Sequence, residues 1–452
     1  MKRLNLFFCL LLISISSISQ SGWTSLFDGK TLTGWKKLAG IAEYTVEDNC
    51  IVGKTVPGSP NTFLVTEQMY GDFILEMDVK IDNENANSGI QLRSHYDAAA
   101  NNGKGRVYGY QFELDPSVRR WTGGIYDEGR RDWLYPLSLN PAAQGAFRLN
   151  TFNHIRVECM GNEIRTWVNG VPCAYIADTV DASGFIALQV HAVQKAADAD
   201  EKIWWKNIKI KTTYLKPALI RDPLYVQGNI PNYLTPYEKK NGWELIFDGR
   251  TAAGWVGAYK DHFPENGWKI GNGELTVLSS EGKEANNGGD IVTVKEYSAF
   301  DLSFDFKFTP GANSGVKYFV TLSEKNTGSA IGLEYQVLDD SLHPDAKLGR
   351  DGNRTLASLY DLIKAEKQSR FIHQPGQWNT GRIVVTPGNH VEHYLNGIKV
   401  LEYERGSEAY RDLVAISKYV IWKNFGEAAK GHILLQDHGN EVSYRSIKIR
   451  KL

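Results

Sequence analysis

The sequence predicts an all-β protein built from two antiparallel β-sandwich domains in tandem. Three observations support this prediction. The same landmarks recur in the same order in the two halves, short runs alternate between apolar and polar residues, and turn residues separate those runs. No long segment has helical periodicity, and 452 residues exceed what one hydrophobic core usually organises.

The N-terminal segment predicts a secretory signal peptide over residues 1–19. Lys2 and Arg3 precede an apolar run, and small residues up to Ser19 follow it at the spacing that a signal peptidase accepts. A membrane-spanning helix needs about 20 apolar residues, and this run is shorter. We therefore expect a periplasmic or secreted protein that is cleaved near Ser19, without a membrane span.

An internal repeat divides the rest of the chain. The ordered matches are too many for chance, and they predict domains over residues 20–213 and 241–452, joined by a proline-containing linker over residues 214–240. The matched segments are 22–29 with 242–249, 34–35 with 254–255, 87–90 with 313–316, 110–111 with 335–336, 125–127 with 359–361, 167–170 with 394–397, and 184–189 with 431–436.

Individual strands follow from period-two alternation. Residues 73–81 in the first copy and 300–308 in the second alternate cleanly between apolar and polar types. Asn-Gly pairs at 169–170 and 396–397 predict tight hairpins, because both turn residues must adopt positive φ. Each copy ends on a further alternating strand, and a two-sheet sandwich per copy follows.

Composition narrows the class of partner. The formal net charge is −1 and no concentrated Lys/Arg run is present, which argues against nucleic acid and anionic membranes as partners. No nucleotide-binding motif or paired metal-binding Cys motif occurs, so no nucleotide cofactor is expected. Three cysteines remain after residue 19, and we expect them to be small buried residues without a disulfide.

The strongest candidates for chemistry lie on one predicted strand of the second copy. Alternation over residues 334–340 sends Glu334, Gln336 and Asp340 to one face. The aligned first-copy strand places Gln111, Glu113 and Asp115 on the corresponding face. The pattern suggests that each copy keeps an acid and an amide over one groove, although a solvated outer face would look the same.

Further polar residues end otherwise apolar strands. Gln436, Asp437 and His438 close one strand, and His191 closes its first-copy counterpart, where packing alone would favour aliphatic residues. Lys317 and Arg93 follow the two Asn-Ser-Gly motifs and could stabilise an oxyanion.

His393 alternates with apolar residues, which is more typical of a hydrogen-bonded core histidine than of a ligand. Tyr126 and Tyr360 occupy matched positions and complete the candidate set as supporting residues.

Together these motifs resemble the 3-keto-disaccharide hydrolase family, formerly a domain of unknown function, with a concanavalin-like jelly-roll fold. The resemblance extends over the chain after residue 19, and each of the two copies resembles the family's domain. The second copy resembles the main single-domain form, whereas the first resembles a divergent branch, with residues 109–116 and 123–131 carrying its distinct motifs.

The resemblance implies cleavage of glycosides that a separate sugar 3-dehydrogenase has already oxidised at C3. It suggests Glu334 or His438 as the base, Lys317 and Gln336 as enolate and hydroxyl contacts, and His393 as an orienting residue or metal ligand. Glu113, Gln111, Arg93 and His191 are the first-copy equivalents. A divalent metal is compatible with the family, but no spacing in the sequence specifies one.

Two other functions fit the same sequence. A non-catalytic carbohydrate-binding pair would use the acids and amides only as hydroxyl partners, and a structural module would dock a protein partner instead. A fold alone does not separate these functions. Histidine, carboxylate and lysine grouped around one groove would favour catalysis, whereas a large apolar patch would favour docking.

Overall fold

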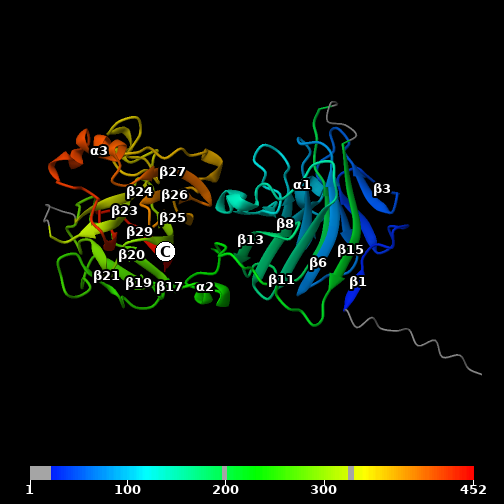
Figure 1. The fold of residues 1–452 in the computed structure, drawn as a ribbon, viewed down its shortest axis with the longest axis horizontal. Helices are drawn as coiled ribbons and strands as arrows, with labels where there is room; N and C mark the ends of the chain where they lie inside the picture. The colour runs from blue at the N-terminus through cyan, green and yellow to red at the C-terminus, as the bar shows by residue number, and fades with distance from the viewer. Residues whose placement is uncertain (1–21, 196–200, 324–329) are drawn as a thin grey trace, which may run out of the picture.

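A computed structural model describes residues 22–195, 201–323 and 330–452 and confirms the predicted all-β fold, with two sandwiches in tandem (Figure 1). The predicted signal peptide, residues 1–19, lies outside the described residues. Within the described part of the chain, no helix is long and apolar enough to cross a membrane.

The first half contains two sheets. The strands of one, in spatial order, are β16 (Gln227–Gly228), β13 (Val171–Ala177), β12 (Glu163–Val168), β11 (Asn153–Met160), β6 (Phe73–Ile81), β15 (Lys202–Lys211), β4 (Cys50–Lys54) and β3 (Glu43–Glu47), with β1 (Trp23–Ser25) paired to β15. Those of the other are β10 (Asp132–Tyr135), β9 (Ile125–Glu128), β8 (Arg106–Leu114), β7 (Ser88–Asp97), β14 (Phe185–Val190), β5 (Thr62–Thr66) and β2 (Trp35–Ala39).

The second half repeats this plan with fewer strands. One sheet contains β19 (Trp268–Gly271), β20 (Glu274–Val277), β29 (Val442–Lys451), β22 (Phe300–Phe308), β25 (Asn379–Val385), β26 (His390–Leu395) and β27 (Ile398–Glu404), with β17 (Trp243–Leu245) paired to β29. The other contains β18 (Trp255–Gly257), β21 (Ile291–Tyr297), β28 (Gly431–Leu435), β23 (Asn313–Thr321) and β24 (Ile331–Leu338).

The helices of the described residues are short and lie in the connections. They are α1 (Ala100–Gly103), α2 (Pro236–Lys240) and α3 (Glu408–Ala415), with 3-10 turns η1 (Leu137–Leu139), η2 (Pro141–Ala143), η4 (Pro344–Lys347), η5 (Ser369–Phe371) and η6 (Lys418–Ile421).

Each core lies between the two sheets of its half. In the second half, the alternating phenylalanines of β22 pack in one buried cluster with Val316 of β23 and Tyr335 of β24. In the first half, apolar residues of β6 pack with Ile90 of β7 and Phe112 of β8. Burial of alternate residues on both sheets therefore stabilises each sandwich.

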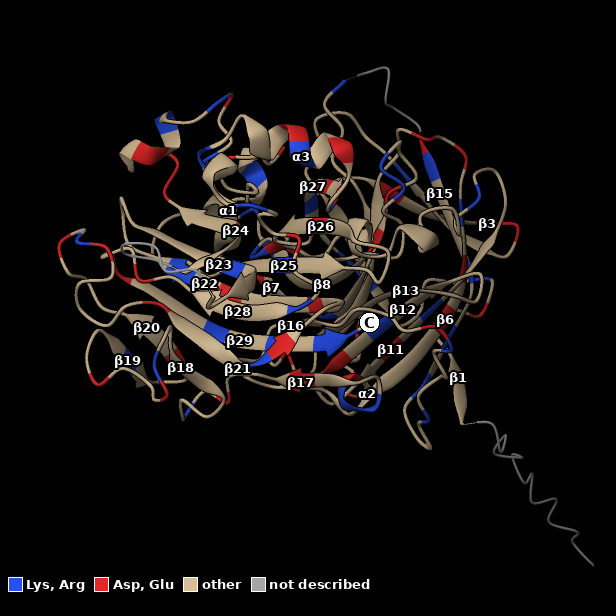
Figure 2. Cartoon of the chain, turned by 60° about the vertical axis from the view of Figure 1, so that its left-hand side comes forward, with Lys and Arg blue, Asp and Glu red and all other residues tan. Residues whose placement is uncertain are grey.

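Local predictions agree with the structure at the hairpins and the cysteines. Asn169 and Gly170 have φ values of 50° and 82°, and Asn396 and Gly397 have 48° and 82°, as tight Asn-Gly turns require. The three described cysteines are buried and unpaired. Acidic and basic residues are interspersed along the ribbons of both halves (Figure 2).

The segment between the two halves is packed against the first. Its strand β16 pairs in parallel with β13, and Val226 lies in a buried cluster with Trp167 and Tyr175. Direct contacts also join the halves: the Ser138 hydroxyl donates to the carbonyl of Gly397 at 2.6 Å. The proline-rich segment is therefore an ordered connection and not a free tether.

A buried ion pair anchors this segment to the second half. Lys448 Nζ of β29 donates to Glu238 Oε1 of α2 at 2.6 Å, and the two side chains are 5% and 1% exposed. We expect Lys448→Met to lower the free energy of unfolding by about 3 kcal/mol, because it leaves Glu238 buried without a cation. Urea unfolding would measure the loss.

Two further variants of this protein serve as controls for this prediction. Lys451→Met removes an exposed lysine of the same strand and should change stability little. Lys448→Met combined with Glu238→Gln should recover part of the lost stability. Equal stability of Lys448→Met and the wild type would contradict a stabilising role for the pair.

Candidate active site

The second half contains a cavity of about 480 Å³ over strands β23, β24 and β28. Six predicted residues line it. They are the candidates Lys317, Glu334, Gln336 and His438 and the supporting residues Gln436 and Tyr360. The structure therefore brings together side chains that lie more than 100 residues apart in the sequence.

Glu334 forms the buried floor of this cavity. It lies directly opposite Lys317 in the β23–β24 register, with Lys317 Nζ 3.9 Å from Glu334 Oε2. Burial raises the pKa of Glu334, while the charges of Lys317 and Lys418 oppose that rise. The side chain of Glu334 extends over Gly315, where a Cβ would approach Glu334 Oε1 to 2.5 Å and displace the carboxylate from its present position.

Amide side chains flank the carboxylate. When its amide is oriented to match its neighbours, Gln336 donates from nitrogen to Glu334 Oε1 at 3.1 Å and to the Ser314 carbonyl at 3.0 Å. Gln436 is 5% exposed, and its Oε1 finds no hydrogen-bond partner among the described residues. A ligand hydroxyl could satisfy this buried acceptor.

The walls include residues that were not predicted from the sequence. Lys418 of η6 lies 4.2 Å from the centre of the Tyr360 ring, and its pKa is lowered by burial. The ring of His343 lies 6.0 Å from that of His438, and the Tyr360 hydroxyl donates to Asp345 at 2.8 Å. Lys418, His343 and Asp345 lie outside the segments that match between the two halves, so the repeat gave no signal for them.

Three predicted residues lie outside the cavity lining. His393 is fully buried in the core, where its Nε2 lies 2.9 Å from the Tyr318 hydroxyl and its Nδ1 3.1 Å from the Ala357 carbonyl. Asp340 accepts hydrogen bonds from the Leu356 N–H and from Lys367. Asp437 accepts hydrogen bonds from glycine N–H groups, including that of Gly289 at 3.0 Å.

The first half has a related cavity of about 320 Å³. Gln111, Glu113, Tyr126 and His191 line it, as do Gln189, which lies two residues before His191, and Trp133, which was not predicted.

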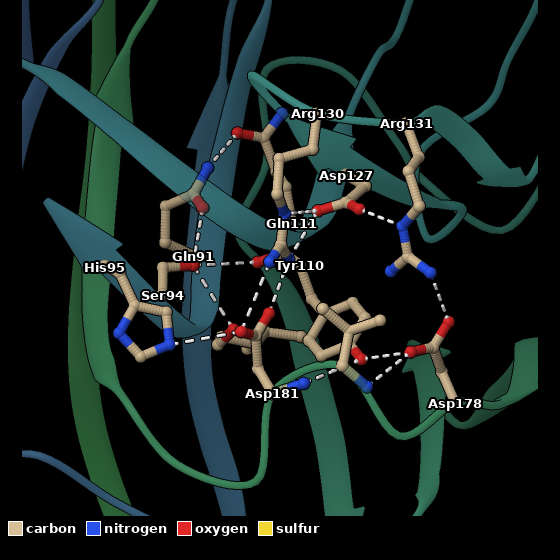
Figure 3. Close-up of polar contacts among 12 residues, drawn as sticks. Gln91, Ser94, His95, Tyr110, Gln111, Asp127, Arg130, Arg131, Asp178 and Asp181 are labelled. Carbon is tan, nitrogen blue, oxygen red and sulfur yellow. Dashed lines mark hydrogen bonds and ion pairs between the residues drawn. The ribbon is translucent and has the colours of Figure 1, made fainter. Parts of the chain in front are cut away.

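A chain of side-chain hydrogen bonds ends on the carboxylate of Glu113 in this cavity. Ser94 donates to Gln91, which donates to Gln111 (Figure 3), and Gln111 donates to Glu113 at 2.8 Å. Asn87 also donates to Glu113, at 2.8 Å. Burial nevertheless raises the pKa of Glu113 to about 7, against the effect of these donors.

The strand register corrects how the two cavities correspond. Gly89 and Gly315 occupy matched positions in the two halves. Gly89 pairs with Glu113 of β8, and Gly315 pairs with Gln336 of β24. Gln111 and Glu334 each lie two residues before these partners, so Gln111 occupies the position of Glu334. The acid and the amide have exchanged places between the halves, whereas the sequence alignment had suggested that the amide stayed in place.

The same register places Gln91 opposite Gln111, where the second half has Lys317 opposite Glu334. Pairing Arg93 with Lys317 is therefore wrong. Arg93 sits at a strand irregularity with φ of 48°, and it donates to the carbonyls of Gly71 and Gly161 and to Asp72.

Ionic contacts hold the remaining first-half residues in place. Asp115 pairs with Arg119 at 2.7 Å. Figure 3 shows a neighbouring cluster of ion pairs, formed by Asp127, Arg130, Arg131, Asp178 and Asp181. The distinct arginines of the first-copy motif thus stabilise the connections around β9.

A histidine and two glutamates lie close together outside the second-half cavity. Among the described residues, one group of three has ligand atoms close enough to hold a metal ion: His390, Glu392 and Glu402 on β26 and β27. Lys399 pairs with both of these glutamates and would compete with an ion.

Both halves of the chain match the same family of domains. Residues 22–211 and 242–450 each match the 3-keto-alpha-glucoside-1,2-lyase-like domain. A 3-keto-disaccharide hydrolase of Bacteroides thetaiotaomicron is 37% identical over 281 residues, which cover 57% of this chain and 92% of that protein.

Similar solved structures include a protein of Parabacteroides distasonis that is provisionally described as a glycosyl hydrolase. It is 28% identical and matches 49% of this chain and all of that chain, with a TM-score of 0.43. A carbohydrate-binding module of Bacillus subtilis is 17% identical and matches 40% of this chain and 97% of that chain, with a TM-score of 0.25.

Proposed function

Because the chain belongs to the 3-keto-alpha-glucoside-1,2-lyase-like family and carries its domain twice, we propose that this carbohydrate-processing enzyme cleaves 3-keto-glycosides in its second-half cavity. The observation that carries the proposal is Glu334, a buried carboxylate at the floor of a cavity that also holds two lysines and several amides. Such a grouping suits proton abstraction from a carbon acid.

The chemistry starts from the acidity that a ketone at C3 gives to the C2 proton. A base removes this proton, and the electron pair moves into the C2–C3 bond and onto the ketone oxygen to form an enolate. The enolate then collapses to form the C1–C2 double bond and regenerate the ketone, while the bond from C1 to the leaving oxygen breaks. Protonation of that oxygen completes the elimination, and addition of water across the double bond gives net hydrolysis.

The side chains of the cavity suit these steps. Glu334 is the base. Its side chain is buried in the cavity, and its ionised carboxylate can accept the C2 proton. Lys317 and Lys418 stabilise the enolate oxygen, and Gln336 and Gln436 bind sugar hydroxyls. His438, whose side chain is 29% exposed, lines the same cavity and protonates the leaving oxygen.

The direct test compares a 4-nitrophenyl 3-keto-α-D-glucopyranoside with its unoxidised parent. The purified protein should release 4-nitrophenol from the keto form alone, and parallel reactions with a chelator would show whether a divalent metal takes part. Measurable sugar binding without release from the keto form would instead favour a carbohydrate-binding module.

Two further proposals concern the cellular setting. A separate sugar 3-dehydrogenase would supply the oxidised substrate, because the proposed elimination requires a ketone at C3. Residues 1–19 would direct the chain to the periplasm or the medium. Detection of the mature N-terminus near residue 20 in the periplasmic fraction would test the second proposal.

The rate should depend on pH through Glu334. Its pKa is raised from 4.5 by burial, so the carboxylate is protonated, and the base lost, at a higher pH than for an exposed glutamate. We expect kcat/KM to fall as pH decreases along one acid limb with an apparent pKa above 4.5. An acid limb at or below that value would contradict the assignment of Glu334 as the base.

A further inference from the structure

Gln189 is the most unusual polar residue of the first half. Its side chain is fully buried on β14 and lines the first-half cavity. Neither its Oε1 nor its Nε2 finds a hydrogen-bond partner among the described residues. A buried amide without partners costs about 1–3 kcal/mol, so a group that enters the cavity and pairs with both atoms would be favoured.

The amide geometry indicates which ligand would fit. Gln189 presents an acceptor and a donor side by side, and a sugar with two adjacent hydroxyl groups supplies the matching pair because each hydroxyl both donates and accepts. Tyr126 and Trp133 line the same cavity and offer aromatic surface to the C–H face of a sugar ring. Glu113 and Asn87 supply further polar contacts.

The second half completes this cavity. Arg370 of η5 reaches from the second half into the lining of the first-half cavity. Its neighbour Phe371 packs against Trp121, with ring centres 6.1 Å apart, and this contact holds η5 in place. Arg370 is exposed and makes no salt bridge with the described residues, so its guanidinium is available to a ligand.

We propose that the first half holds a second carbohydrate site, which binds a glycoside through adjacent hydroxyls without cleaving it and is completed by Arg370 of the second half. The absence of cleavage follows from the exchanged residues. Gln111 stands where the second half has its carboxylate Glu334, and Gln91 stands where it has Lys317. The inference depends on the proposed function in one respect, which is that a glucoside is chosen as the ligand.

Calorimetric titration of Glu334→Gln with 4-nitrophenyl 3-keto-α-D-glucopyranoside would count the sites. We expect two molecules bound per chain, and one after Gln189→Leu is added. Arg370→Ala, a surface change that leaves the core intact, should weaken the first-half site by about 10-fold or more. The matched controls Gln68→Leu and Arg250→Ala alter exposed residues and should keep both sites.

Two results would overturn the proposal. One is a single bound molecule in Glu334→Gln that neither Gln189→Leu nor Arg370→Ala affects. The other is cleavage that persists in Glu334→Gln and disappears when Glu113→Gln is added, because the first half would then be a second catalytic site. Failure of the wild type to cleave any keto-glycoside would overturn the proposed function, but a count of two bound molecules would still support this inference.

Discussion

Replacing Glu334 by glutamine should lower kcat/KM on a 3-keto-glycoside by about 10³-fold, within the range that general bases contribute. The substitution keeps the shape of the side chain and its place opposite Lys317 but removes the group that accepts the C2 proton. Binding should persist, because the amide can still contact the sugar. Steady-state release of 4-nitrophenol would measure the rate, and calorimetry would measure binding.

The matched control for this variant is Glu265→Gln, which makes the same chemical change at an exposed position of the second half. It should leave the rate within about twofold of the wild type, since surface changes away from a site have small effects. A Glu334→Gln protein that is folded, binds the substrate and still cleaves it at the wild-type rate would rule out Glu334 as the base. His438 would then be the next candidate.

Much of the fold could be predicted because its signals are local. The alternation over β6 and β22 reports directly which residues face the core, and the two Asn-Gly pairs specify their turns through positive φ. Glu334 and Gln336 were placed on one face by the same period-two rule. These predictions needed no knowledge of how distant strands pair.

The remaining features depend on strand register and on loops. A one-residue irregularity after Leu92 turns Arg93 away from the cavity, and residue type alone could not reveal it. The exchange of Gln111 and Glu113 relative to the second half became visible only from the pairing of β7 with β8. Lys418 begins the 3-10 turn η6 and His343 directly precedes η4, and strand periodicity carries no information in such connections.

Replacing Lys317 should also lower the rate of cleavage strongly. Lys317→Met should lower kcat by about 10²-fold, because removing one group that stabilises an oxyanion typically has an effect of that size. Lys418 remains in the cavity and would retain part of the stabilisation. Lys295→Met is the matched control, since Lys295 is an exposed lysine of β21.

The pH profile of Lys317→Met separates an electrostatic role from a merely structural one. Burial raises the pKa of Glu334, and the charge of Lys317 is the largest influence that lowers it. Without that charge the pKa of Glu334 rises further, so the acid limb of kcat/KM should move to higher pH. A slower enzyme with an unmoved acid limb would show that Lys317 does not act on the carboxylate. A rate and a limb that both match Lys295→Met would remove Lys317 from the mechanism and leave Lys418 as the cation beside the enolate.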